Sequence, residues 1–154
     1  MRILVTAKED NCCTQMAKEW LRKFDNGIDV YSAGIEHAGV LDQLAVRVMA
    51  EAGIDMSRNT CEWIGKYLSQ DWDYVISLAG DQLKELLCFG GRVKQILYWD
   101  FPDLSQQTGP DPILLEEYRI VRHELRNRCF DFYLLDLLGR QILGADSCGA
   151  ECDL

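Results

Sequence analysis

Strand-type and helix-type segments alternate along this chain, and few folds accommodate that order. Four short apolar runs have the composition of buried parallel strands: Arg2–Thr6, Asp29–Ser32, Asp73–Leu78 and Val93–Tyr98. Apolar residues recur at helical spacing in four further segments: Cys13–Phe24, Leu41–Ala52, Asp81–Leu87 and a long helix that begins near Pro112. We therefore predict an α/β fold with a four-stranded parallel sheet, right-handed crossovers and helices on both faces.

The carboxyl ends of the predicted strands should form the functional face, because ligands of open parallel sheets bind there. The segments that follow the first, third and fourth strands meet at this edge. They are Thr6–Thr14, Leu78–Asp81 and Trp99–Gly109. We expect these three segments to line one common crevice.

The length of the chain, 154 residues, fits one domain with a single core. We assign residues 1–138 to this domain and residues 139–154 to a flexible acidic tail that carries Cys148 and Cys152. The formal net charge is −9, which argues against nonspecific nucleic-acid binding and against docking on anionic membranes. We therefore expect neither a nucleic-acid nor a membrane partner.

The chain has no apolar stretch long enough for a transmembrane helix and no apolar leader at its N-terminus. Without a secretory signal, its cysteines are best interpreted as reduced thiols of a cytoplasmic protein. There are seven: Cys12, Cys13, Cys61, Cys88, Cys129, Cys148 and Cys152. Their spacing matches no strong zinc motif, so we expect no metal and no cofactor.

Six motifs follow one another in a specific order. They are CCTQMA at Cys12–Ala17, YSAG at Tyr31–Gly34, AGIDMS at Ala52–Ser57, DYVISLAGD at Asp73–Asp81, YWDFPDLSQQTG at Tyr98–Gly109 and EYRIVRHELRNR at Glu117–Arg128. Over about residues 2–135 the chain thereby resembles the low-molecular-weight protein tyrosine phosphatase family, and within it the thioredoxin-coupled arsenate reductase branch. The resemblance implies a flavodoxin-like fold.

The resemblance also implies a specific chemistry, carried by Cys-x5-Arg between the first strand and the first helix. In that family the loop cradles an oxyanion with its backbone N–H groups, and the cysteine attacks as a thiolate. The arginine grips two oxyanion oxygens, and an aspartic acid from a later loop protonates the leaving group. The arsenate reductase branch adds further cysteines and a thioredoxin-type reductant.

This chain departs from that pattern where the chemistry is carried. Ala7 stands at the nucleophile position and Cys13 at the arginine position, and Ala79 replaces a second cysteine of the arsenate reductase branch. A methyl group cannot act as a nucleophile, and no side chain replaces the missing guanidinium. The residues of the expected ligand-binding loop are Ala7, Lys8, Glu9, Asp10, Asn11, Cys12, Cys13 and Thr14. Glu9 and Asp10 place negative charge where an oxyanion would approach, and we interpret the changes as natural degeneration.

Some positions of the family pattern survive. Asp103 matches the general acid, although Leu104 follows it where proline is usual, and Cys12 matches a second loop cysteine. Ser32 matches a serine that supports the loop. Cys88 lies near the position at which the arsenate reductase branch has its distal resolving cysteine. Trp99 belongs to an aromatic group at the expected rim of the crevice.

Three hypotheses for function remain. The first is a degenerate family member that binds a small oxyanion, another small ligand or a protein partner at the first loop. The second is an active arsenate reductase or phosphatase that uses Cys12 or Cys13 as its nucleophile, with Asp103 as the acid and a thioredoxin-type reductant. The third is a thiol redox or soft-metal binding protein. A helix N-terminus depresses thiol pKa values, so a reactive Cys12 or Cys13 is the expectation that separates the last two from the first.

Overall fold

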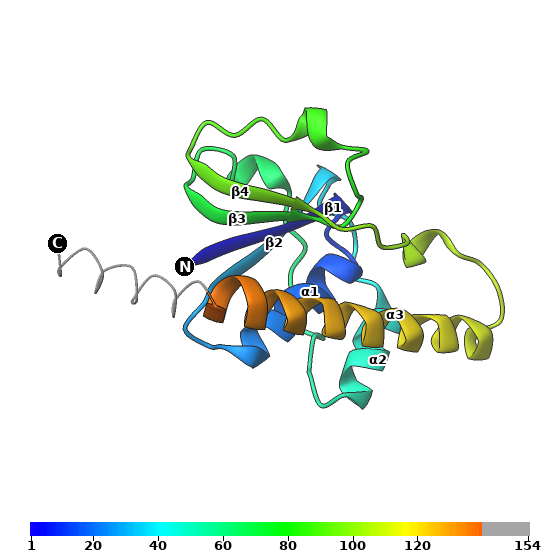
Figure 1. Cartoon of the computed structure of the whole chain (residues 1–154). Coiled ribbons are helices and arrows are strands. Elements are labelled where there is room, and N and C mark those ends of the chain that lie inside the picture. The colour runs from blue at the N-terminus through cyan, green and yellow to red at the C-terminus, as the bar shows by residue number, and fades with distance from the viewer. Residues whose placement is uncertain (140–154) are drawn as a thin grey trace, which may run out of the picture.

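The computed structural model describes residues 1–139 and shows one α/β sandwich built around a parallel sheet (Figure 1). The strands are β1 (Arg2–Glu9), β2 (Asp29–His37), β3 (Trp72–Ser77) and β4 (Val93–Tyr98). The α-helices are α1 (Cys13–Phe24), α2 (Gln43–Glu51) and α3 (Asp111–Phe132). Short helices complete the fold: the 3-10 helices η1 (Ile64–Lys66), η2 (Lys84–Leu86) and η3 (Leu104–Gln106), and the π-helical segment η4 (Tyr133–Leu138) that continues α3.

The four strands lie in the order β2-β1-β3-β4 and all pair in parallel. This arrangement confirms the predicted flavodoxin-like sheet. Parallel strands need crossover connections, and α1 supplies the crossover from β1 to β2. Both inner strands are apolar and buried, as expected for a sheet that is covered on both faces.

Each face of the sheet has its own core. Figure 1 shows α1, α2 and α3 on one side of the sheet, where they cover Ile3, Val5 and Ile76. On the other face, short 3-10 helices and loops cover Leu4 and Val75, with an aromatic cluster at its centre. That cluster consists of Tyr31, Tyr67 and Trp72, whose ring centroids lie 5.6–5.7 Å apart.

The first two strands are longer than the sequence pattern predicts. Strand β1 continues through Ala7, Lys8 and Glu9, which were expected to belong to a loop. Strand β2 continues past Ser32, the predicted end, through Gly34 to His37. A side chain at Gly34 would meet the carbonyl oxygen of His37 at 1.7 Å, so this glycine permits a close backbone approach rather than a stop.

The predicted helix over Asp81–Leu87 is wrong, because this segment contains only the single 3-10 turn η2. Its apolar side chains pack locally against the second core instead of forming a stripe: Leu83 and Leu87 both belong to that cluster. The longer helices agree with the prediction. Gly53 has φ +82° just after α2, and an apolar stripe of α3 is buried: Leu115, Tyr118, Val121, Leu125 and Phe132.

Two further expectations concern the C-terminal part and membranes. The acidic tail with Cys148 and Cys152 falls outside the described residues, apart from Gly139. Among residues 1–139, no helix combines the length and apolar character that crossing a bilayer requires. The longest, α3, carries charged side chains along its whole length.

Candidate functional site

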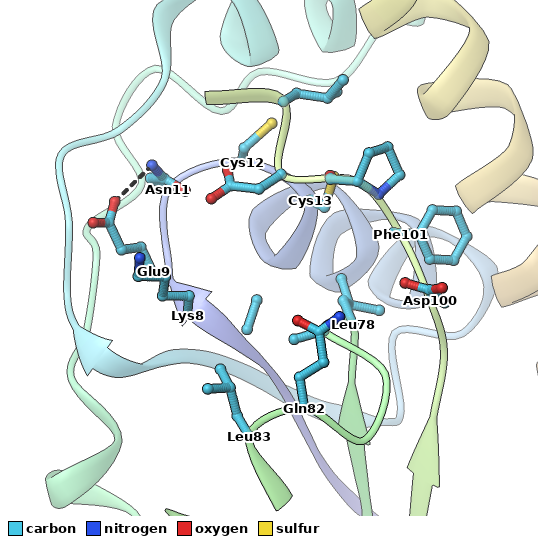
Figure 2. Close-up of a pocket in the computed structure, with 15 residues that line it drawn as sticks. Lys8, Glu9, Asn11, Cys12, Cys13, Leu78, Gln82, Leu83, Asp100 and Phe101 are labelled. Carbon is cyan, nitrogen blue, oxygen red and sulfur yellow. Dashed lines mark hydrogen bonds between the residues drawn. The ribbon is translucent and has the colours of Figure 1, made fainter. Parts of the chain in front are cut away.

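The three segments at the carboxyl ends of β1, β3 and β4 enclose a crevice of about 360 Å³, as the strand order predicts. We call it the first-loop crevice, after residues 7–14, which we call the first loop. Its lining residues are Ala7, Lys8, Glu9, Asn11, Cys12, Cys13, Leu78, Ala79, Gln82, Leu83, Asp100, Phe101, Pro102, Asp103 and Leu104. Figure 2 shows side chains of all three segments around this common space.

The first loop is not built as an anion cradle, because its first three residues continue strand β1. Glu9 pairs with His37 of β2, and the backbone N–H of Asp10 donates to the carbonyl oxygen of Ala38 at 2.9 Å. A backbone nest for an anion uses residues in αR and αL conformations in succession. No residue of the first loop has a positive φ angle. The backbone here is bonded to the sheet and does not form such a nest.

Asp10 belongs to the first loop, but its side chain is fully buried and does not line the crevice. One carboxylate oxygen accepts a hydrogen bond from the hydroxyl of Thr14 at 2.8 Å, and the other accepts one from the backbone N–H of Glu62 at 2.9 Å. Burial raises the pKa of Asp10, and these hydrogen bonds, together with the Ser32 hydroxyl, offset part of that rise. Asp10 therefore anchors the loop from below.

The two adjacent cysteines at the start of α1 are both buried, at 3% and 8% exposure for Cys12 and Cys13. The hydrogen bond with Cys13 and the burial of the thiol raise the pKa of Cys12 well above its ordinary value. The negative charges of Asp42 and Asp103 raise it further. This is the opposite of the lowered thiol pKa expected from a helix N-terminus. The thiol of Cys13 donates weakly to the carbonyl of Pro102 at 3.7 Å.

The charges that line the crevice are mostly negative. Within the described part of the chain, Glu9, Asp100 and Asp103 oppose a single base, Lys8, whose ammonium group lies 3.8 Å from Glu36 outside the crevice. Glu9 accepts a hydrogen bond from the amide of Asn11 at 3.0 Å, the dashed line in Figure 2. An entering oxyanion would meet net repulsion here.

Asp103, the expected general acid, reaches the crevice but is also used locally. One of its carboxylate oxygens accepts hydrogen bonds from the backbone N–H and the hydroxyl of Ser105, at 3.2 and 2.6 Å, and so caps η3. Within residues 1–139, no group of three or more His, Cys, Asp or Glu side chains is arranged to hold a metal ion.

Of the expected supporting residues, only Ala79 lines the crevice. Ser32 is buried under the first loop beside Asp10, and Thr14 likewise faces away from the crevice. Cys88 is exposed after η2 and lies outside the crevice, where its thiol donates to the carbonyl of Glu85 at 3.4 Å.

The expectation that Trp99 forms the crevice rim is wrong. It is 5% exposed and packs edge-on against Phe132, with ring centroids 5.7 Å apart. Its neighbour Phe101 lines the crevice instead. Alternation along an extended backbone explains the difference, since the side chains of successive residues point in opposite directions.

Sequence reasoning missed one pair of residues that lines the crevice and one hydrogen-bonded pair that lies next to it. Gln82 and Leu83 close its side opposite the first loop, and the motif at Asp73–Asp81 stops just short of them. Behind Cys12, the hydroxyl of Tyr118 donates to Asp42 at 2.5 Å and ties α3 to the start of α2. Only the second group had a sequence signal, because Asp42 precedes a helical pattern as an N-cap residue does.

Comparison with known proteins supports one family. The family model described as low molecular weight phosphotyrosine protein phosphatase matches residues 2–142. An arsenate reductase of Halalkalibacterium halodurans is 36% identical over 124 residues, which cover 80% of this chain and 88% of that protein. A glutaredoxin arsenate reductase of Synechocystis is 31% identical, over 82% of this chain and 92% of that protein. The solved structure of an arsenate reductase in its reduced state superposes with a TM-score of 0.67 at 27% identity, covering 85% of this chain and 95% of the other.

Proposed function

The chain belongs to the low molecular weight phosphotyrosine protein phosphatase family, and from that membership we propose that it acts by binding at the first-loop crevice, without Cys-x5-Arg chemistry. One observation carries this proposal. The two positions that the reaction needs hold the methyl group of Ala7 and a buried thiol, Cys13, whose hydrogen bond goes to Pro102. Without a nucleophile the covalent route is absent, whatever the binding energy.

The lining of the crevice favours a small ligand that is neutral or positively charged. Leu78, Leu83 and Phe101 supply apolar contacts, while Asp100 and Asp103 supply carboxylates. A volume of about 360 Å³ is in the range of small-molecule sites. A protein partner that inserts one side chain, such as a lysine or an arginine, would satisfy the same surroundings.

Catalysis through Cys12 or Cys13 is less well supported. Both thiols are buried, and the raised pKa of Cys12 keeps it protonated, whereas the thiolate is the nucleophile and the metal ligand. The relatives are named arsenate reductases, one of them a glutaredoxin arsenate reductase. A thioredoxin- or glutaredoxin-type reductant would be a partner of this chain only if it were active. On the net charge of −9, we also propose that the protein has no nucleic-acid or membrane partner, and on its unpaired cysteines we propose a cytoplasmic location.

Turnover of arsenate and of para-nitrophenyl phosphate tests the absence of the family reaction. The full chain is assayed with dithiothreitol and with complete thioredoxin and glutaredoxin systems, and an active arsenate reductase is assayed in parallel. We expect no rate above the enzyme-free background. A rate that is abolished by Cys12→Ser or Cys13→Ser would overturn the proposal and identify the nucleophile.

Binding of two matched probes tests the ligand class. Benzylamine and benzylphosphonate share a ring and carry opposite charge. We expect benzylamine to bind more tightly, and Asp100→Asn to reduce that preference because it removes one lining carboxylate. Tighter binding of benzylphosphonate at the first loop would contradict the proposal, and so would equal binding of the two.

A further inference from the structure

A second hollow lies at the β2 edge of the sheet, between α1 and the segment that leads into η1. Its volume is about 290 Å³. The lining residues are Lys18, Arg22, Tyr31, Ser32, Arg58, Asn59, Thr60, Glu62 and Tyr67. We call it the edge hollow. It shares no lining residue with the first-loop crevice, so its ligand is argued independently of the function proposed above.

The edge hollow gathers three cationic side chains on a chain whose net charge is −9. Lys18 is 8% exposed, yet among residues 1–139 its ammonium group forms no hydrogen bond and no ion pair. Burial lowers the pKa of Lys18, and the negative charge of Asp10 offsets part of that fall. The side chain is largely buried, but it lines the edge hollow without a direct partner among the described residues, so its ammonium group is available to an anion from outside.

The other two cations leave room for the same anion. Arg58 is exposed and, within the described part of the chain, forms no hydrogen bond or ion pair. Arg22 donates from one nitrogen to the carbonyl of Val30 at 2.7 Å, and a second nitrogen lies 3.5 Å from the carboxylate of Glu19. The guanidinium group still has N–H donors beyond these two contacts that an oxyanion could use.

The acidic groups nearby are already engaged. Both carboxylate oxygens of Asp10 accept hydrogen bonds, from Thr14 and from the backbone of Glu62. The side chain of Glu62 lies 3.5 Å from Lys66 and accepts from Thr60 at 3.4 Å. Asp10 and Glu19 are the two carboxylates that raise the pKa of Lys18, but neither forms an ion pair with its ammonium group, and Glu19 is paired with Arg22 at 3.5 Å.

Two tyrosines add neutral donors to the lining. The hydroxyls of Tyr31 and Tyr67 form no hydrogen bond with any residue between 1 and 139. Their rings pack against each other and against Trp72, so they form a rigid wall. A tetrahedral oxyanion has several acceptor oxygens and could use cationic and hydroxyl donors together.

We propose that the edge hollow is a binding site for a phosphate-class oxyanion, held by Lys18, Arg22 and Arg58. The ligand is either a free oxyanion or the phosphoryl group of a larger molecule. The family's own loop and this site would then lie at different places in one chain, with the acidic first-loop crevice on one side of Asp10 and the basic edge hollow on the other.

Titration of the full chain with inorganic phosphate, at constant ionic strength and followed by amide chemical shifts, tests the proposal. We expect saturable shifts at residues 31–32 and 58–62 and not in the first loop. Arg58→Gln should weaken binding about tenfold, since it removes a charge-assisted contact. Lys18→Met should weaken it at least as much, and Arg58, being exposed, keeps the test valid if the Lys18 variant does not fold.

Two matched controls complete the design. Lys8→Gln removes a base that lines the first-loop crevice, and Lys84→Gln removes an exposed lysine of η2; both should leave phosphate affinity unchanged. Glycerol 3-phosphate in place of phosphate separates the two ligand sources, because tighter binding of the ester indicates the phosphoryl group of a larger molecule. Absence of saturable binding overturns the proposal, as does binding that Lys8→Gln abolishes and Arg58→Gln leaves intact.

Discussion

The carboxyl group of Asp10 accepts the backbone N–H of Glu62 at 2.9 Å, which joins two segments that are 52 residues apart. Gln15 strengthens the same junction, since its amide donates to the carbonyls of Asp10 and Thr60 at 3.0 and 3.1 Å. The first-loop crevice and the edge hollow therefore share one internal support. A substitution that breaks these hydrogen bonds should therefore alter both the first-loop crevice and the edge hollow.

Replacement of Asp10 by alanine should destabilise the protein by about 2 kcal/mol, because the hydroxyl of Thr14 and the N–H of Glu62 would be left buried without an acceptor. Urea denaturation at pH 7 measures the difference. Asp25→Ala, whose carboxylate accepts from Gly27 in an exposed turn, serves as a control and should cost much less.

The loss caused by Asp10→Ala should also depend on pH. The folded-state pKa of Asp10 lies above its ordinary value of 3.8, so the stability that this group contributes is complete below the unfolded pKa and decreases as pH rises through the folded pKa. The difference between wild type and variant should therefore be larger at pH 4 than at pH 7. A larger difference at pH 7 would show that the carboxyl group is not desolvated.

Thiol labelling should distinguish the cysteines sharply. Among the cysteines of residues 1–139, Cys88 is exposed and should react first with iodoacetamide at pH 7.5, whereas Cys12 and Cys129 are buried with raised pKa values and should react last. Mass spectrometry of digests over time gives the order. If Cys12 reacts faster than free cysteine, its surroundings stabilise the thiolate, and the proposed absence of thiol chemistry fails.

An ion-pair network between α2 and α3 should give the protein a stability that is lost in acid. Glu51 accepts from Arg119 at 2.7 and 2.9 Å and from Arg122 at 3.0 Å, and these contacts lower its pKa to about 2. A lowered acid pKa contributes stability above about 4.5 that disappears as pH falls toward 2.

Glu51→Gln should therefore lower the urea midpoint at pH 6 and leave it unchanged near pH 2. The effect at pH 6 should shrink in 1 M salt, because the network is exposed to solvent. Glu117→Gln, an exposed α3 residue without an ion pair in the described part of the chain, is the control. An equal effect of both variants would mean that the ion-pair network does not cause the change in urea midpoint.

The core position of Trp99 can be tested through its partner. Phe132 packs edge-on against Trp99 and Tyr74, so Phe132→Ala should cost about 3–5 kcal/mol of unfolding free energy. Phe130→Ala on the same helix is a matched control, since Phe130 is 36% exposed and should cost far less. Comparable losses would place Phe132 outside the core.

Restoring the two lost side chains alone should not restore the reaction. In a variant with Ala7→Cys and Cys13→Arg, the backbone of the first loop stays bonded to β2, and Glu9 keeps its charge beside the crevice. We expect para-nitrophenyl phosphate turnover to remain at background. Activity in this variant would show that the loop backbone can rearrange around an oxyanion and that only the side chains had been lost.

Much of the fold could be predicted because its signals are local. The apolar runs predicted the bounds of β3 and β4 to within one residue, and helical spacing over Leu41–Ala52 located α2. The extension of β1 and β2 could not be predicted, since it depends on pairing between segments about 27 residues apart. Helical spacing over Asp81–Leu87 misled because packing against the second core overrides local preference.

The candidate site shows the same division. The crevice itself followed from the rule that ligands bind beyond the carboxyl ends of parallel strands. The properties of single residues did not follow, because they depend on neighbours that are distant in the sequence. Asp10 is anchored by Glu62, and the burial of Cys12, with its hydrogen bond to Cys13, outweighs the effect of the helix N-terminus.

The pairing of β1 with β2 as far as Glu9 limits how this scaffold could be re-engineered. Side-chain exchange suffices where a template loop already has the required backbone, but here the loop belongs to the sheet. A designer would have to graft the whole first loop together with the segment from Gly34 to Ala38 that holds it. Re-engineering this molecule therefore requires replacing the paired ends of β1 and β2 together, and not a single catalytic residue.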